Sequence, residues 1–316
     1  LNKKFQMKTL LSLLMSIHEK VYLERTTLKD EKNGVIKATK WRMNSRPVLE
    51  SLIKSWESLY IKNGGVLYLQ DSNLSLIYNK DPVLRLILPL LSFVKIRKCI
   101  HLTPIIEKIW LKDWDGMNEC LKQLSDDPEA LKDATNYALD IVKLWIDYVS
   151  IVNDAEKTSI RTPIFFIICM FTSLLIIAEF LLSVEKWAHN FDEENPTTYL
   201  NAIERTLWLR SEMIFKKVES NLILNENNKT YAEFLRLEAK GALDVKTLDD
   251  ELAKRAMNPN TEIKETLQVI KDARLSSRGL YMGVRILADA PIWPIALLFA
   301  QAFKSRAIYI SKSQPS

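Results

Sequence analysis

Carboxylate, histidine and cysteine side chains are the groups in this sequence that could perform acid–base or metal chemistry. Neighbouring carboxylates occur at Asp113 and Asp115, at Asp126 and Asp127, and at Asp192, Glu193 and Glu194. Such pairs can transfer protons when a second reactive group lies beside them. No His, Lys or glycine-rich loop is spaced to work with these carboxylates. We therefore interpret them as helix-start charges and solvated turns.

The cysteines and histidines are too scattered to form a metal site. The three Cys are at 99, 120 and 169, and the three His are at 18, 101 and 189. No Cys-x-x-Cys or HExxH spacing occurs, and the odd number of Cys favours free, reduced thiols. Phosphate-binding glycine motifs are also absent from the sequence. The sequence therefore predicts no catalytic, metal-binding or cofactor-binding residues, and a protein that is not an enzyme.

The composition favours an ordered helical protein. The 316 residues are 47% hydrophobic and 26% charged, with a net charge of +5. Only 7 residues are Gly, the residue that supplies the positive-φ turns of loop-rich and sheet-rich folds. We therefore expect an all-α, multi-helix bundle.

Capping residues followed by proline mark several helix starts, because proline has no N–H to leave unpaired in the first turn. The candidate starts are Ser45-Arg46-Pro47, Thr103-Pro104, Asp127-Pro128, Thr162-Pro163 and Asn195-Pro196, and a capping-box-like sixth is at 247–250. One departure from helix is expected at about 66–78, where two β-rich runs flank the polar turn Asp71-Ser72-Asn73. We predict one small β-hairpin there.

Residues 127–154 carry a single apolar stripe along one helix. Its members recur at alternating steps of four and three residues, at Ala134, Ala138, Ile141, Trp145, Tyr148 and Val152. The segment 195–224 offers a partner helix, although Arg210 interrupts its seam. We expect these two segments to pack antiparallel.

Residues 164–184 have the length and composition of a membrane span. The segment has one charge, Glu179, and no helix breaker between Ile164 and Val184, with Phe171 and Leu175 among its apolar residues. Glu179 lies near one end, where it could snorkel or face a protein partner. The alternative is a helix buried on all sides in a soluble bundle.

A second apolar segment, 280–303, is interrupted by Pro291 and Pro294, which would bend or restart a helix. Trp293 with the basic residues Lys304 and Arg306 suits an anchor at a membrane interface, and a core helix is the alternative for this segment. Basic residues before 164 and acidic residues after 184 place the N-terminal region in the cytoplasm.

The first 60 residues hold 12 Lys and Arg against 6 Asp and Glu. This excess could meet nucleic acid or anionic lipid, but no nucleic-acid-binding module matches. A solvated surface is favoured, and nucleic acid is not an expected partner.

These features predict three segments: a helical region with the hairpin at 1–160, a membrane span at 161–190, and a helical region at 191–316. The predicted function is a membrane-anchored, non-enzymatic assembly or docking component with protein partners and a lipid bilayer. This layout resembles membrane subunits of bacterial secretion and conjugation machines. Two alternatives remain open: a soluble helical interaction protein or secreted effector with 164–184 as its core helix, and an α-helical pore-forming toxin.

Overall fold

The chain is all-α, as the sequence predicts. The computed structural model describes residues 5–27, 39–67, 82–192, 199–221, 254–258, 262–289 and 291–313, and these residues form helices and no strand. Two compact units divide the chain, Leu1–Leu102 and Thr103–Ser316, here called unit 1 and unit 2. The segment boundaries predicted at 160 and 190 fall inside unit 2.

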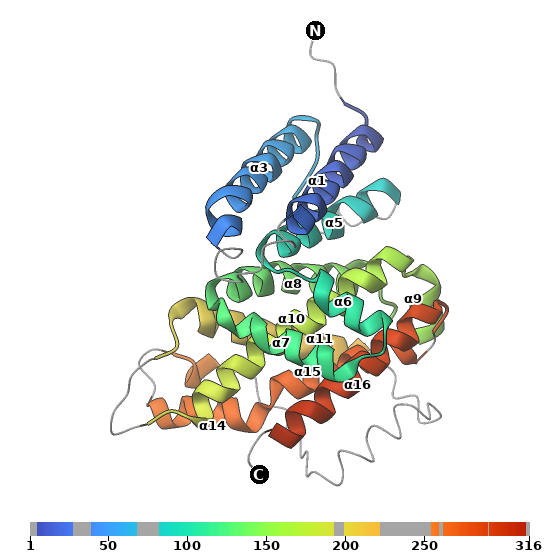
Figure 1. Cartoon of the computed structure of the whole chain (residues 1–316). Helices are drawn as coiled ribbons and strands as arrows, with labels where there is room; N and C mark the ends of the chain where they lie inside the picture. Colours follow the sequence, from blue (N-terminus) through green and yellow to red (C-terminus); the bar gives the residue numbers. More distant parts are fainter. Residues whose placement is uncertain are drawn as a thin grey trace. The chain divides into compact units, whose positions relative to one another are not determined.

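Unit 1 packs three helices against one another, α1 (Met7–Thr27), α3 (Arg46–Lys62) and α5 (Pro82–Cys99) (Figure 1). A short π-helical turn, η2 (Trp41–Ser45), leads directly into α3. Each of the first two helices buries one stripe, because apolar residues recur three or four positions apart. The stripe on α1 is Leu10, Leu14, Ile17 and Val21, and the stripe on α3 is Leu49, Ile53, Trp56 and Tyr60.

The side chain of Trp56 joins α3 to α1 in unit 1. Trp56 donates from Nε1 to the carbonyl oxygen of Leu10 at 2.8 Å, so its one polar atom is satisfied inside the core. Its ring also stacks on Tyr60, with centroids 5.0 Å apart. Helix α5 continues through Pro89, with Ile87, Leu88 and Leu91 buried.

Unit 2 is built around α10 (Ile164–His189), which packs against α8 and α15 and also touches α11, α14 and α16 (Figure 1). The other described helices are α6 (Thr103–Trp110), α7 (Trp114–Lys122), η3 (Gln123–Asp126), α8 (Pro128–Tyr148), α9 (Ala155–Arg161), α11 (Ala202–Asn221), α14 (Ile263–Ala273), α15 (Leu275–Ala288) and α16 (Pro294–Ser313). Because neighbours surround α10, it can be apolar on every side without meeting solvent.

Aromatic side chains attach α16 to the centre of unit 2. Phe171 of α10 stacks on Phe299 at 4.1 Å between centroids and meets Phe303 at 4.9 Å. Gly283 of α15 lies directly under the Phe303 ring, and a Cβ there would come within 2.4 Å of it. The missing side chain therefore permits the close approach of α15 and α16.

Four of the six predicted helix starts are confirmed. Helices begin at Arg46 after Ser45, at Thr103, at Pro128 and at Ile164 after Pro163. The start at Pro128 is capped as expected, since the Asp127 carboxylate accepts from the backbone N–H of Ala130 at 3.2 Å. The starts predicted at Asn195 and at 247–250 lie outside the described residues.

The predicted hairpin is not supported. Val66 and Leu67 are described and belong to no strand, and the rest of the 66–78 segment lies outside the described residues. The segment 280–303 behaves as its prolines indicate, because α15 ends at Ala288 and α16 begins at Pro294.

Candidate interaction surface

The residues proposed to lie in a membrane instead form the core of unit 2. Phe171, Leu175 and Val184 are buried, whereas Ile164, at the first turn of α10, is 44% exposed. By length and apolar character α10 could cross a bilayer, yet 83% of its most apolar stretch is buried inside the protein. The buried-core alternative therefore describes α10 in this fold.

Glu179, the one charge within 164–184, forms a buried ion pair with Arg306 of α16. The guanidinium donates from Nε and Nη2 to the two carboxylate oxygens, each at 2.6 Å, and both side chains are 2% exposed. Arg306 also donates from Nη1 to Asn118 Oδ1 of α7 at 3.1 Å. Three helices thus meet at one planar, two-pronged contact, the geometry that suits arginine and carboxylate.

The ion pair gives a structural role to Glu179 and Arg306, for which the sequence predicts a role at a membrane. The sequence predicts that Arg306 anchors a membrane interface and that Glu179 snorkels or faces a protein partner, but in the structure each neutralises the other. A buried pair of this kind costs desolvation of both charges, so loss of either partner would leave an uncompensated charge in the core. Asn118 was not singled out, and no spacing in the sequence links it to residues about sixty and nearly two hundred positions away.

A second carboxylate of α10, that of Glu185, caps the first turn of α15. Glu185 accepts from the backbone N–H of Ser276 at 2.8 Å and from its hydroxyl at 2.5 Å. Ser276 lies in the first turn of α15, where backbone N–H groups have no partner within the helix. The negative charge also suits the positive end of the helix dipole.

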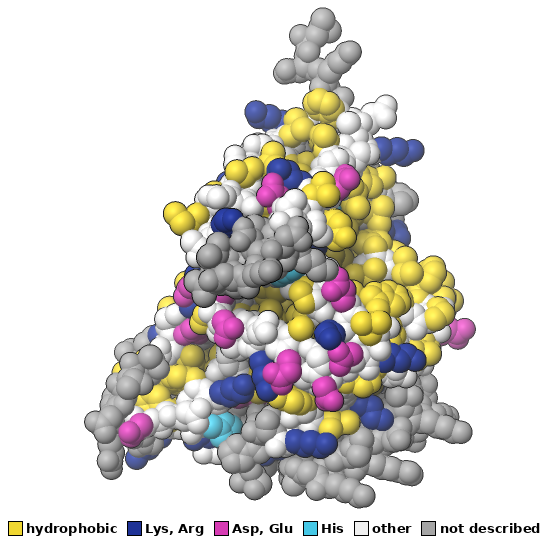
Figure 2. All heavy atoms as spheres, viewed as in Figure 1, with side chains coloured by type: hydrophobic (Ala, Val, Ile, Leu, Met, Phe, Trp, Pro, Cys, Tyr) yellow, Lys and Arg dark blue, Asp and Glu magenta, His cyan; other side chains and the backbone are white. Residues whose placement is uncertain are grey.

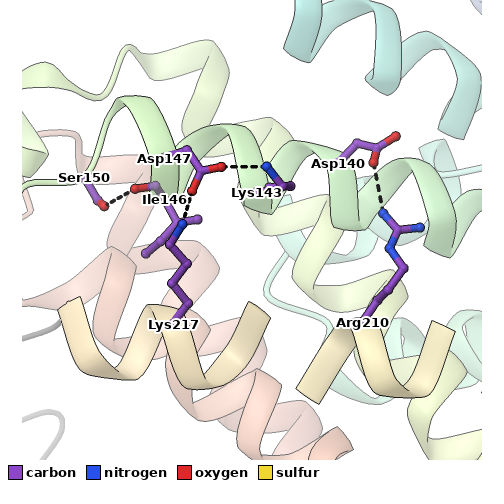
Figure 3. A network of polar contacts seen from close by, with 7 residues as sticks. All are labelled: Asp140, Lys143, Ile146, Asp147, Ser150, Arg210 and Lys217. Atoms are coloured by element: carbon purple, nitrogen blue, oxygen red, sulfur yellow. Dashed lines mark hydrogen bonds and ion pairs between the residues drawn. The ribbon is translucent and has the colours of Figure 1, made fainter. Parts of the chain in front are cut away.

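A ladder of polar contacts joins α8 to α11 (Figure 3). Lys132 meets Glu204 at 3.4 Å, Arg210 donates to Asp140 at 3.1 Å, and Lys217 donates to Asp147. The partner numbers rise together along both helices, so α8 and α11 run parallel. The prediction of antiparallel packing is therefore wrong in direction, although it paired the right segments.

The contacts that Arg210 makes explain why the interface between α8 and α11 tolerates its charge. Arg210 reaches across to α8, where it donates to Asp140 (Figure 3) and to Asn136. Burial alone would raise the pKa of Asp147 further along the ladder, but hydrogen bonds from Lys143 and Lys217 outweigh burial and hold that pKa below its usual range. The contacts are charge-paired and lie partly in solvent, so they position the two helices without forming a reactive centre.

Trp293 lies in the connection between α15 and α16 and is half-buried. Its Nε1 donates to the carbonyl oxygen of Thr162 at 3.2 Å, which ties this connection to the residues just before α10. Lys304, the remaining predicted anchor residue, is half-buried on α16. The structure thus places Trp293 near the start of α10. Arg306 has a different role, because it pairs with Glu179 in the core.

Exposed apolar side chains occur on the segments that surround the cavity beside Thr162. They come from the α8–α9 connection, α9, the start of α10, the α15–α16 connection and the start of α16, and we call them the α9 surface: Val152, Ile160, Ile164, Ile292 and Leu297. Each is more than two-fifths exposed. Figure 2 shows hydrophobic side chains on this flank of the molecule. An apolar patch that remains open to solvent is typical of a protein contact surface.

The cavity beneath the α9 surface is too small for a substrate or cofactor. It has a volume of about 30 Å³ and is lined by residues that include Trp145, Thr158, Thr162, Arg285 and Asp289. A single molecule takes up about this volume in liquid water. Within the described ranges, no three His, Cys, Asp or Glu side chains are grouped to hold a metal ion.

The fold defined so far is a helical protein with a paired-charge core and an exposed apolar surface. Two proteins of Saccharomyces cerevisiae (strain ATCC 204508 / S288c) are similar to nearly all of it. "Respiration factor 2" is 43% identical over 317 residues, which cover 98% of this chain and 23% of that protein. "Probable transcription factor TDA9" is 45% identical over 311 residues, which cover 98% of this chain and 24% of that protein.

The chain therefore spans about a quarter of the length of the curated relatives it matches. No family model matches the chain, and no solved structure matches it. The comparison thus rests on the two yeast proteins, and it concerns one region of each.

These relatives overturn the prediction of a membrane-anchored assembly component with a cytoplasmic N-terminal region. Neither name describes a membrane subunit, a secretion machine or a toxin. The physical reason for the error is that an apolar helix surrounded by protein has the same composition as one surrounded by lipid. The alternative of a soluble helical interaction protein fits the relatives better.

Proposed function

We propose that this chain is a non-enzymatic, helical interaction module of a transcription-factor protein. The observation that carries the proposal is the similarity of 98% of the chain to one region of "Probable transcription factor TDA9". The second relative is named for respiration, and its similarity covers the same share of this chain. A region this long, similar in sequence in two proteins about four times its length, suits one module among several.

The geometry of unit 2 supports protein contact over chemistry. The cavity below α9 has room for little more than water, and the buried Glu179–Arg306 pair is closed off by α7, α10 and α16. The α9 surface, by contrast, leaves five large apolar side chains in solvent. Covering such a surface with a partner protein would release ordered water and stabilise the complex.

A reporter assay tests the proposal. The full 316-residue chain is joined to an unrelated DNA-binding domain, and transcription from the matching promoter is measured. We expect transcription to change relative to the DNA-binding domain alone. Phe171→Asp serves as the control, because a charge in the core of unit 2 should unfold it and abolish the effect. A stable, nuclear wild-type fusion that leaves transcription unchanged contradicts the proposal.

The same assay tests the α9 surface. Ile160→Glu and Leu297→Glu place a charge on exposed positions of that surface and should reduce the effect on transcription without unfolding the chain. Ile203→Glu is the matched control, since Ile203 is equally exposed in unit 2 but lies on α11. An equal response of all three variants would exclude the α9 surface as the point of contact.

A further inference from the structure

Unit 1 and unit 2 carry opposite net charges. Residues 1–102 contain 18 Lys and Arg against 8 Asp and Glu, a net charge of +10. The remaining residues contain 26 Lys and Arg against 31 Asp and Glu, a net charge of −5. The excess positive charge of the whole chain therefore belongs entirely to unit 1, and it favours anionic partners.

The described part of unit 1 cannot neutralise this charge internally. It holds 12 Lys and Arg, and its carboxylates are Glu19, Glu24, Glu50 and Glu57. Three of them already pair within the unit, Glu24 with Lys20, Glu50 with Lys54 and Glu57 with Lys95. The carboxylates of this part can balance only a third of its cations, so the surface remains electropositive.

One face of α3 carries two apolar side chains that are open to solvent. Val48 is 51% exposed and Leu52 is 37% exposed, and they lie one helical turn apart on one side. The short side chains Ser51 and Ser55 lie beside them, and both are exposed. A hollow of about 480 Å³ lies beside this face and shares Ser51 and Ser55 with it; its other lining residues are Pro47, Glu50, Lys54 and Ser58.

Cations flank both ends of this face. Lys40 and Arg42 precede it and are exposed beside Met43, which is 72% exposed, and Lys62 is exposed in the last turn of α3. Along the middle, Glu50 and Lys54 neutralise each other at 3.2 Å. The charge is therefore positive at the ends and balanced between them. Figure 2 shows hydrophobic side chains interspersed with Lys and Arg over α1 and α3.

We propose that this face of α3, defined by Val48, Ser51, Leu52 and Ser55, docks an acidic amphipathic helix of a partner protein. The apolar stripe of the partner packs on Val48 and Leu52, and the serines let the two helix backbones approach closely. Acidic residues at the ends of the partner helix meet the cations that flank the face. This inference does not depend on a role in transcription.

Two other occupants fit the same observations less well. A second copy of the chain docked through the same face would bring two units of charge +10 together, which opposes a symmetric contact there. Single-stranded nucleic acid binds through exposed aromatic rings as well as cations. The aromatic residues of η2 and α3, Trp41, Trp56 and Tyr60, are all buried.

A binding measurement with a defined probe tests the proposal. The full chain is titrated with a fluorescent peptide designed as an amphipathic helix, with Leu along one stripe and Glu on the flanks. A scrambled peptide of identical composition has the same charge but no stripe. We expect the helical peptide to bind at least about tenfold more tightly, because only it presents a continuous apolar face.

Two charge substitutions on α3 provide the matched pair of variants. Leu52→Glu should weaken binding of the helical peptide at least about tenfold, since it places an acid in the apolar contact. Ile61→Glu adds the same charge to the same helix at a residue that is 53% exposed, but about 180° around it. It should change binding much less.

The proposal is overturned if the two peptides bind alike, or if Leu52→Glu and Ile61→Glu weaken binding equally, because attraction would then be purely electrostatic. A DNA duplex of matched length is titrated in parallel at several salt concentrations. Tighter binding to DNA that is indifferent to Leu52→Glu would assign the positive charge to nucleic acid and exclude the helix-docking role.

Discussion

The two units satisfy their buried polar groups in different ways. Unit 2 pairs charged side chains with each other, as in Glu179 with Arg306 and in Arg278, which donates to both carboxylate oxygens of Glu219 at 2.5 and 2.6 Å. Unit 1 has fewer carboxylates. Its buried Lys98 still meets Glu50 at 3.6 Å, but its Arg25 is held by backbone carbonyls. Arg25 donates to the carbonyl oxygens of Arg97 and Lys98 at 3.3 and 3.2 Å.

These carbonyls belong to the last turn of α5, where they have no partner within the helix. Trp41 also donates to the Lys98 carbonyl oxygen, at 3.1 Å, and its ring lies 3.3 Å from the guanidinium carbon of Arg25. The negative end of the α5 dipole thus receives a cation in place of a carboxylate. Burial and the nearby Arg97 and Arg46 lower the pKa of Arg25, since like charges crowd it. A unit rich in cations can therefore bury an arginine without a carboxylate partner.

The largest expected effect comes from breaking the buried pair of unit 2. Glu179→Ala should destabilise unit 2 by about 3–5 kcal/mol, because Arg306 would remain buried without its counter-charge. Glu179→Leu combined with Arg306→Met should recover much of this loss. Hydrogen exchange of the full chain measures both units separately. Equal stability losses for the single and double variants would show that packing, and not charge pairing, dominates at this site.

Lowering the pH should weaken unit 1 selectively. Burial and the charge of Arg97 lower the pKa of His18 to about 4, although its hydrogen bond to the Leu90 carbonyl opposes the shift. The neutral ring donates from Nε2 to that carbonyl and accepts at Nδ1 from Arg97 at 3.1 Å. A proton on Nδ1 would remove the second bond and add a repulsive charge.

The direction of the pH effect follows from these two states. The unfolded chain binds a proton at His18 near its ordinary pKa of 6.5, whereas the folded chain does so only near 4. The contribution of neutral His18 to the free energy of unfolding is therefore fully present above pH 6.5. It is lost as the pH drops towards 4, by about 2 kcal/mol at pH 5 and about 3 kcal/mol in full. Hydrogen exchange at pH 7 and pH 5 should show the loss in α1 and α5, and His18→Gln should flatten it. An unchanged pH profile in that variant would assign the effect to other groups.

Crowding α15 against α16 should cost less than removing a charge. Gly283→Ala places a Cβ within 2.4 Å of the Phe303 ring, so the ring or α16 must shift, at a cost of about 1–3 kcal/mol. Phe303→Leu in the same background should relieve part of the strain. Thermal unfolding of the full chain measures both variants. A Gly283→Ala chain as stable as the wild type would show that α16 moves freely over α15.

The sequence predicts local features of this fold and misses its distant pairings. Asp127-Pro128 marks a helix start because a cap and a proline act within one turn. The apolar run at 164–184 predicts a long helix but cannot tell lipid from protein neighbours. The contact between Glu179 and Arg306 spans 127 residues and has no periodic signature. The parallel direction of α8 and α11 is likewise set by the path through α9 and α10.

The smallest expected effect lies in the exposed ladder between α8 and α11, and it separates buried charge pairs from surface ones. Lys217 is 55% exposed and pairs with Asp147, which Lys143 also contacts at 2.8 Å. Water screens such a pair, and ordering the long Lys217 side chain offsets part of the attraction. A double-mutant cycle of Asp147→Asn and Lys217→Met should therefore give a coupling energy of about 0.2–1 kcal/mol, which shrinks in high salt. A coupling as large as that of Glu179 and Arg306, unaffected by salt, would mean that burial does not distinguish the ion pairs of unit 2.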